Sequence, residues 1–120
     1  MLHEELSGKI IGAAMEVHKQ LGPGFLESVY EHALAIELTE RQEPYNRQAP
    51  IAVIYKQIQI GEYRADFLVD CKIILEAKAT ASLIPEHYAK VLHYLTATGL
   101  RLALLINFGA QSLQFKRIIR

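Results

Sequence analysis

The pattern of apolar residues predicts two helices at the N-terminal end of the chain. Between His3 and Gln20, apolar residues recur at helical spacing, which indicates an amphipathic helix; they are Leu6, Ile10, Ala13, Ala14 and Val17. The residues Leu-Gly-Pro-Gly at 21–24 interrupt this pattern, because glycine and proline punctuate a tight connection. A second helix is predicted from Phe25 to Arg41.

Runs of β-branched and aromatic residues predict strands in the middle of the chain. Pro44 and Pro50 bracket a predicted loop, and Ile51–Tyr55 follows as a strand. Gly61 is predicted to mark the turn before the segment Tyr63–Lys78, in which two runs of strand formers flank a polar turn. This segment therefore predicts a β-hairpin.

The last third of the chain returns to helical spacing and then to strands. A helix is predicted over 82–98, since Pro85 falls near its first turn and Gly99 provides a stop. The apolar run within 101–107 suits a buried strand, and the alternation within 113–119 suits an edge strand. The order ααβββαββ predicts an α/β (α+β) fold in which helices flank a central mixed β-sheet.

The predicted hairpin separates apolar from charged residues. With 70–72 as the turn, the cross-strand pairs are Val69/Ile73, Leu68/Ile74, Phe67/Leu75 and Asp66/Glu76. One face is then typical of a core and holds Ala65, Phe67, Val69, Ile73, Leu75 and Ala77. The other face sets Asp66 opposite Glu76, with Lys78 two residues beyond Glu76.

Two carboxylates directly opposite each other destabilise a sheet, which indicates that a cation binds between them. A divalent metal fits the pattern, since Mg²⁺ favours one or two carboxylates together with water and phosphate oxygens. The alternative is an exposed hairpin face whose charges align by chance, because a short Asp…Glu-x-Lys pattern is common. The metal hypothesis also depends on the register, because a slip of one residue exchanges the two faces.

Length and composition describe one globular domain that spans residues 1–120. Of the 120 residues, 51% are hydrophobic, and the formal net charge is zero, which argues against a disordered chain. No apolar run approaches the roughly 20 residues that span a bilayer, and the N-terminus has no signal-peptide pattern. The single Cys71 forms no internal disulfide. We therefore expect a cytoplasmic protein with no membrane partner.

Several short motifs are spread over nearly the whole chain. They are Val17-His18, Leu21-Gly22-Pro23-Gly24, the combination Gly24/Glu27/Tyr30, Tyr63-Arg64-Ala65-Asp66, Glu76-Ala77-Lys78, Tyr94-Leu95, Thr98-Gly99-Leu100 and Leu105-Ile106-Asn107-Phe108-Gly109. Together they resemble the GxxExxY proteins, a small-domain branch of the PD-(D/E)XK nuclease superfamily. The core of that superfamily is similar to the predicted order of elements.

The resemblance implies a role for each residue of the central motifs. Asp66 and Glu76 would hold the metal, with the backbone carbonyl of Ala77 as a further ligand. Glu27 would be an acidic residue contributed by the helix before the sheet. Its place in the first turn of that helix supports this role, because the positive end of the helix dipole favours a carboxylate. Lys78 would be the motif lysine.

Other residues would be accessory to the site. Tyr30 lies three residues after Glu27 and is expected to pack against the site or to hydrogen-bond to it. His18 and His87 are candidates for a ligand or an acid–base group, although a helical histidine is more often a packing residue. Lys90 stands where many members of the superfamily have glutamine, a turn before Tyr94. A lysine there would touch a phosphate, but it would also add positive charge near the metal.

The resemblance implies metal-dependent hydrolysis of nucleic-acid phosphodiester bonds, with DNA as the expected substrate and Mg²⁺ or Mn²⁺ as the cofactor. Lys78 would orient water or stabilise charge that develops on the phosphoryl group. Arg64 and Lys90 would grip neighbouring phosphates without reading the sequence of bases.

Two other functions are compatible with the same residues. One is a non-catalytic binding or assembly module that keeps the nuclease fold, and the other is a hydrolase of a small phosphorylated molecule. Resemblance of fold does not decide among them, because one fold hosts many functions. The apolar strand Ala103–Ile106 and the edge strand after it are expected to support a homodimer.

Overall fold

The computed structural model describes all residues from Met1 to Arg120. The helices are α1 (Glu4–Leu21), α2 (Glu27–Glu40) and α3 (Pro85–Thr98). The strands are β1 (Tyr45–Tyr55), β2 (Ile58–Val69), β3 (Ile73–Lys78), β4 (Leu102–Asn107) and β5 (Gln114–Ile119). This order confirms the predicted succession of elements and the α+β fold. No helix combines the length and apolar composition that a membrane-spanning segment requires.

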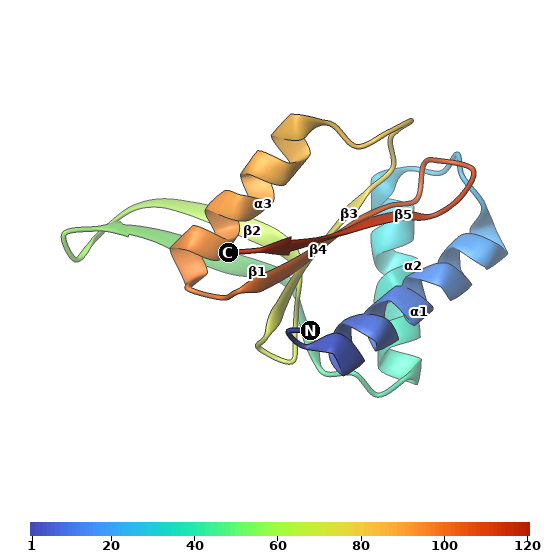
Figure 1. The fold of residues 1–120 in the computed structure, drawn as a ribbon, viewed down its shortest axis with the longest axis horizontal. Helices are drawn as coiled ribbons and strands as arrows, with labels where there is room; N and C mark the ends of the chain where they lie inside the picture. The colour runs from blue at the N-terminus through green and yellow to red at the C-terminus, as the bar shows by residue number, and fades with distance from the viewer.

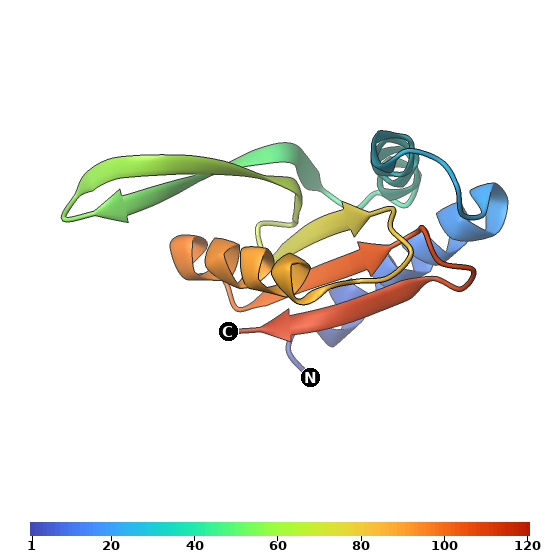
Figure 2. The ribbon, with the colours of Figure 1, turned by 90° about the horizontal axis from the view of Figure 1, so that it is seen from above.

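The strands form a single mixed sheet in the order β1-β2-β3-β4-β5. Strands β3 and β4 are parallel, and all other neighbours are antiparallel. Helices α1 and α2 pack on one face of the sheet, and α3 packs on the other (Figures 1 and 2). Helix α3 is the crossover between β3 and β4, a connection that parallel strands require.

Each face of the sheet has its own apolar core. The larger core contains 17 buried residues and lies beneath α1 and α2, whereas the smaller core contains 9 and lies beneath α3. Strand β4 contributes to both, because Leu102, Leu104 and Ile106 belong to the larger core and Ala103 and Leu105 to the smaller one. This double burial explains why β4 is a continuous apolar run rather than an alternating one.

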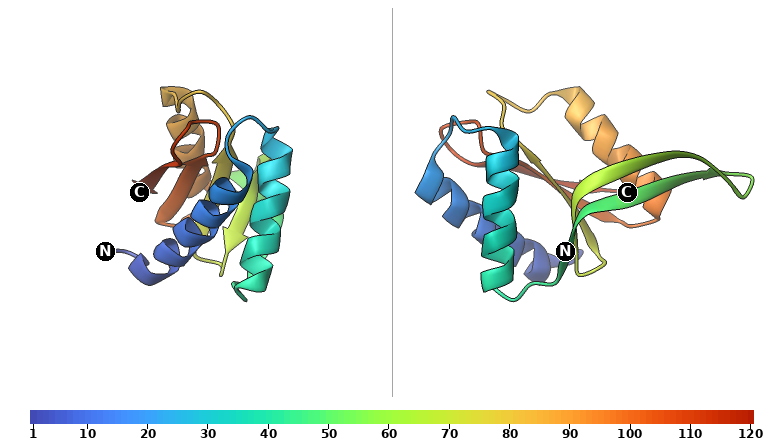
Figure 3. Two further views of the ribbon diagram at one scale, coloured as in Figure 1. Left: turned by 90° about the vertical axis from the view of Figure 1, so that its right-hand side faces the viewer. Right: turned by 180° about the vertical axis from the view of Figure 1, so that it is seen from behind.

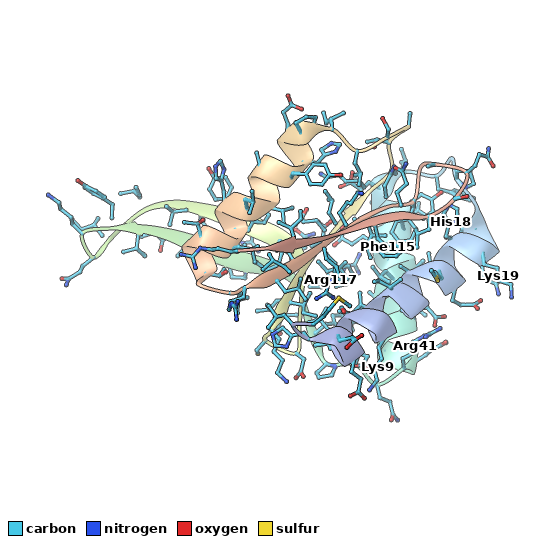
Figure 4. All side chains as sticks on the ribbon, viewed as in Figure 1. Lys9, His18, Lys19, Arg41, Phe115 and Arg117 are labelled. Carbon is cyan, nitrogen blue, oxygen red and sulfur yellow. The ribbon has the colours of Figure 1, made fainter.

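The burial of β4 contradicts one prediction. The segment Ala103–Ile106 is 0% exposed, so it is not available to a second copy of the chain. Strand β5 is an edge strand, as predicted. Its Arg117 reaches back to the first turn of α1, where the guanidinium donates to the Ser7 hydroxyl and to the Leu2 carbonyl (Figure 4).

The first hairpin differs from the prediction. Tyr45–Pro50, expected to be a loop, forms the first half of β1. The proline is tolerated because β1 is an edge strand, where a missing N–H need not break the ladder. Gly61 lies within β2 instead of at the turn. The turn is formed by Lys56 and Gln57, whose φ values of 47° and 69° are typical of a type I′ hairpin.

The second hairpin has the predicted turn and register, with the pairs Phe67/Leu75, Leu68/Ile74 and Val69/Ile73. Beyond Phe67 the ladder to β3 ends, and β2 continues with β1 as a long two-stranded projection (Figure 3). Ala65 was expected on the same face as Phe67, but it packs in the smaller core. The two residues fall on different sides because β2 changes course where it leaves β3.

Candidate functional site

Asp66 and Glu76 face each other at the point where β2 and β3 separate. The Glu76 carboxylate accepts a hydrogen bond from the Asp66 amide at 2.9 Å, and the Asp66 carboxylate accepts one from the Ala77 amide at 2.8 Å. These two contacts replace the ladder bonds that would otherwise continue the strand pairing. Each side chain is therefore fixed by the backbone of the opposite strand. The prediction placed the two residues as a cross-strand pair; the ladder stops one pair short of them, at Phe67 and Leu75, and the reciprocal contacts bring them together instead.

Each carboxylate keeps one oxygen free. Asp66 Oδ1 and Glu76 Oε2 accept no hydrogen bond, and no unpaired side-chain oxygen of the chain is sealed from solvent. Burial raises the pKa of Asp66 to about 6. Burial, together with the neighbouring charge of Asp66, raises the pKa of Glu76 to about 7. The pair is thus preorganised by backbone amides, partly desolvated, and accessible through one oxygen of each group.

Glu27 is placed by the loop that precedes α2. It is the first residue of that helix, and the loop turns at Gly24, whose φ of 114° is in the region that favours glycine. The Tyr30 hydroxyl donates to the Gly22 carbonyl and accepts from the Phe25 amide at 3.2 Å. Tyr30 therefore holds the loop that presents Glu27. This contact gives a structural reason for the spacing of Gly24, Glu27 and Tyr30.

Lys78 is the last residue of β3 and lies between the sheet and α2. Its ammonium Nζ is 3.8 Å from the Glu27 carboxylate oxygen Oε1, and its side chain is 15% exposed. The expected convergence of three acidic ligands is not formed, because no three His, Cys, Asp or Glu side chains are grouped so that they could hold a metal. Glu27 instead neutralises the lysine.

The chain matches the family model of the PD-(D/E)XK nuclease superfamily over residues 4–118. It belongs to that superfamily. A similar solved structure is the crystal structure of an alkaline exonuclease (LHK-Exo) from Laribacter hongkongensis, with a TM-score of 0.57 and 16% sequence identity. The match covers 78% of this chain and 55% of the exonuclease, so the chain spans little more than half of that protein. No curated protein matches the chain.

The family match and this fold likeness establish a restriction-endonuclease-like fold and support a nuclease. Nucleases of the PD-(D/E)XK type generally use divalent metals. The match to the superfamily does not single out its GxxExxY branch.

Helix α3 adds Lys90 and Tyr94 to the site of this PD-(D/E)XK protein. The Lys90 ammonium lies 5.8 Å from the centre of the Tyr94 ring. Desolvation lowers the pKa of Lys90, but Tyr94 and the carboxylates of Glu76 and Asp66 more than offset it, so the pKa is raised. Burial, followed by the Glu76 charge, raises the pKa of Tyr94. The lysine at the position usual for glutamine therefore lies within electrostatic range of both carboxylates.

Two residues to which the sequence analysis gave little or no weight also border the site. Glu31 lies one turn after Glu27, where its charge helps to raise the pKa of Asp66, and it accepts hydrogen bonds from Arg47 at 3.1 Å and Gln48 at 2.7 Å. His87 accepts the Ile84 amide on Nδ1 at 3.1 Å. Desolvation, then the charge of Lys78, lowers the pKa of His87. The signal in the sequence that could have indicated Glu31 was its spacing from Glu27, which places both carboxylates on the same side of the helix.

Asn107 fixes the segment that follows Lys78. It is the parallel-strand partner of Lys78 and is 0% exposed. Its carbonyl oxygen accepts from the amides of Thr80 and Gly109, each at 3.0 Å, and its amide donates to the Thr80 carbonyl and to Gln114. The Phe108 amide donates to the Lys78 carbonyl at 2.8 Å. The asparagine thereby locks the end of β3, a role that its sequence position alone did not reveal.

The remaining candidates do not meet at the carboxylates. His18, in the last turn of α1, contacts the Ala110 carbonyl through Nε2 at 3.0 Å, which joins α1 to the loop before β5 (Figure 4). Arg64 donates to the Gln48 carbonyl at 3.2 Å and lies 3.9 Å from Glu62. These contacts give both side chains a structural role.

Proposed function

We propose that the chain is a metal-dependent nuclease that hydrolyses phosphodiester bonds, with DNA as its substrate and Mg²⁺ or Mn²⁺ as its cofactor. The observation that carries this proposal is the geometry at the separation of β2 and β3. Asp66 and Glu76 are fixed there by backbone amides, each with one free oxygen, and Lys78 ends the same strand two residues beyond Glu76. This is the arrangement of acidic and basic groups for which the superfamily is named.

The donor set fits a hard divalent cation. Mg²⁺ is usually held by one or two carboxylates and completes its coordination with water and substrate phosphate oxygens. The two free oxygens of Asp66 and Glu76 provide such ligands, and the raised pKa of each group reflects its burial, a cost that a bound cation would offset. The carbonyl of Ala77 is proposed as a further ligand, whereas Glu27 is paired with Lys78 and is left out of the ligand set. A bound divalent ion would polarise a phosphoryl oxygen and acidify water.

The basic residues of the site would act on the substrate. Lys78 stabilises negative charge that develops on the phosphoryl group, because a fixed cation is most effective where water is excluded. The ion pair with Glu27 restrains the ammonium before substrate arrives. Lys90 and Arg64 bind neighbouring phosphates, and such contacts position a nucleic acid without selecting bases.

A nuclease assay tests the proposal. Purified protein is incubated with Mg²⁺ or Mn²⁺ and with single-stranded, double-stranded or branched DNA, or with RNA. We expect cleavage that EDTA abolishes and that Asp66→Asn or Lys78→Ala reduces at least about 100-fold. The matched control is Asp70→Asn, an exposed carboxylate in the β2–β3 turn. Cleavage that the site variants leave intact would contradict the mechanism.

A metal titration distinguishes the nuclease from a non-catalytic module. The ion pair of Lys78 with Glu27 and the lack of a three-ligand group favour the second function as an alternative. Isothermal calorimetry with Mn²⁺ should give a binding heat for the wild type that is lost in Asp66→Asn. No heat at millimolar metal, combined with no cleavage of any substrate, would assign the fold to binding or assembly.

A further inference from the structure

The far half of the β1–β2 hairpin is an exposed arm. This distal arm, residues 52–62, projects beyond the rest of the molecule (Figures 1 and 2, and the right-hand view of Figure 3). It carries large apolar side chains that no other element covers: Tyr55, Ile58 and Ile60 are 59%, 66% and 64% exposed. A contiguous apolar surface of this kind on a folded chain marks an interaction site.

The two faces of the distal arm differ in their surroundings. Val53, Ile54 and Tyr63 line a cavity that α3 also borders, so this face belongs to the body of the protein. Tyr55 and Ile58 are cross-strand partners, and Ile60 follows Ile58 on the same side of β2 because strand residues alternate. Tyr55, Ile58 and Ile60 therefore form one patch, the outer patch, which faces away from α3.

Charges at the two ends of the outer patch have opposite signs. At the tip, the Lys56 ammonium lies 5.5 Å from the centre of the Tyr55 ring, which brings it to the outer patch. At the base, Glu62 follows Ile60 on the same side of β2, and its carboxylate is loosely paired with Arg64 at 3.9 Å. Residues 52–62 contain one basic and one acidic side chain, so the arm is neutral and unsuited to grip a polyanion.

We infer that the outer patch binds the outer patch of a second copy of this chain in an antiparallel, two-fold arrangement. In such an isologous contact, the tip of one arm meets the base of the other. Lys56 of each copy then lies beside Glu62 of its partner, while the isoleucines and Tyr55 cover each other at the centre. The outer patch thus carries both the positive and the negative charge that this contact pairs. A surface that binds an unrelated partner does not need to be complementary to itself.

The small size of the arm predicts a weak dimer. Interfaces that bury less than about 1,200 Å² in total are typically transient. We therefore expect a dissociation constant in the micromolar range and a monomer at nanomolar concentration. This inference is independent of the proposed nuclease activity, because none of its residues belongs to the carboxylate site.

Sedimentation equilibrium of the purified chain over a wide concentration range tests the dimer. Ile58→Ser and Ile60→Ser should each raise the dissociation constant roughly tenfold or more, because each removes apolar area from the contact. The matched control is Ile36→Ser, which changes an isoleucine of α2 that is 52% exposed and far from the arm. That control should leave the dissociation constant unchanged.

Charge reversal distinguishes this antiparallel contact from any other. Lys56→Glu or Glu62→Lys alone should weaken the dimer, and the double variant should restore it. The rescue can arise only between copies, because the strand from Ile58 to Glu62 already spans about 13 Å within one chain. A wild type that stays monomeric at high micromolar concentration would overturn the inference. So would a dimer that is insensitive to Ile60→Ser, or arm variants that weaken DNA binding instead of self-association.

Discussion

Strand β2 serves two regions that contrast sharply, the carboxylate site and the distal arm. At Asp66 the two carboxylates are each held by a backbone amide of the opposite strand, and both residues are buried or half-buried. A few residues away, the same strand presents isoleucines to solvent and is supported only by β1. The first region is fixed by contacts with neighbouring elements, whereas the side chains of the second are exposed and free to contact another molecule. Substitutions of the same type in each region measure this difference.

The largest expected effect on stability is that of adding a methyl group at Gly109. A Cβ at Gly109 would lie 2.3 Å from the Thr80 carbonyl oxygen, a backbone atom that cannot move without disturbing Asn107. A Cβ at Gly61 in the distal arm would be 3.8 Å from Val53 Cβ, an ordinary contact. We expect Gly109→Ala to lower the free energy of unfolding by about 3 kcal/mol or more, as severe overpacking does.

Urea denaturation of Gly109→Ala and Gly61→Ala tests this contrast, with both variants measured beside the wild type. Gly61→Ala should change stability by no more than about 0.5 kcal/mol, as is usual for surface positions. Equal effects at the two glycines would show that the segment after β3 is less rigid than the structure indicates.

The next effect is stabilisation by removal of a buried charge. The pKa of Glu76 is raised from 4.5 to about 7, so the folded chain binds this proton more tightly than the unfolded chain. The ionised group therefore destabilises the metal-free protein above pH 7, and the cost disappears as the pH falls toward 4.5. At about 1.4 kcal/mol per pKa unit, Glu76→Gln should stabilise the protein by up to about 3 kcal/mol at pH 8.

Urea denaturation of the wild type and of Glu76→Gln at pH 8 and pH 5, without divalent metal, measures this gain in stability. The glutamine carbonyl can still accept the Asp66 amide, so the gain should be large at pH 8 and small at pH 5. Glu62→Gln in the distal arm is the matched control and should be nearly neutral at both values. If Glu76→Gln destabilised the protein at pH 8, the burial of an ionised carboxylate would not be the cost inferred here.

The smallest expected effect is the loss of one hydroxyl. Tyr30→Phe keeps the stacking on Phe108, whose ring centre is 4.8 Å away, but it leaves the Gly22 carbonyl and the Phe25 amide without their partner. We expect a loss of about 1 kcal/mol, the usual net contribution of a hydrogen bond. Tyr55→Phe in the distal arm, where the side chain is 59% exposed and its hydroxyl makes no hydrogen bond within the chain, should be neutral. Thermal denaturation of the two variants measures both losses of stability. A larger loss for Tyr55→Phe than for Tyr30→Phe would contradict the prediction.

The sequence predicted the parts of the fold that follow from periodicity. The alternation around the 70–72 turn gave the register of β2 and β3, because a slip would have exposed Phe67 and Leu75. The continuous apolar run of β4 indicated burial on both faces. The same register predicted that Asp66 and Glu76 lie near each other, although the ladder ends before them and contacts from side chain to backbone take its place.

The sequence did not predict features that depend on the path of the chain in space. Neither Lys56 nor Gln57 is a favoured residue for a type I′ turn, so the turn was placed at Gly61. Ala65 packs in the smaller core, on the other side of the sheet from Phe67, because β2 separates from β3 next to it. The alternation of apolar residues along the sequence does not show this separation. Asn107 acquires its contacts with Thr80 from a segment distant in sequence, and only the folded chain brings the two together.

The continuity of β2 has a structural consequence. No break separates Ile58 at the tip from Asp66, and the amide of Asp66 is the group that orients Glu76. One uninterrupted strand therefore carries both the exposed tip of the distal arm and the backbone amide that positions the Glu76 carboxylate.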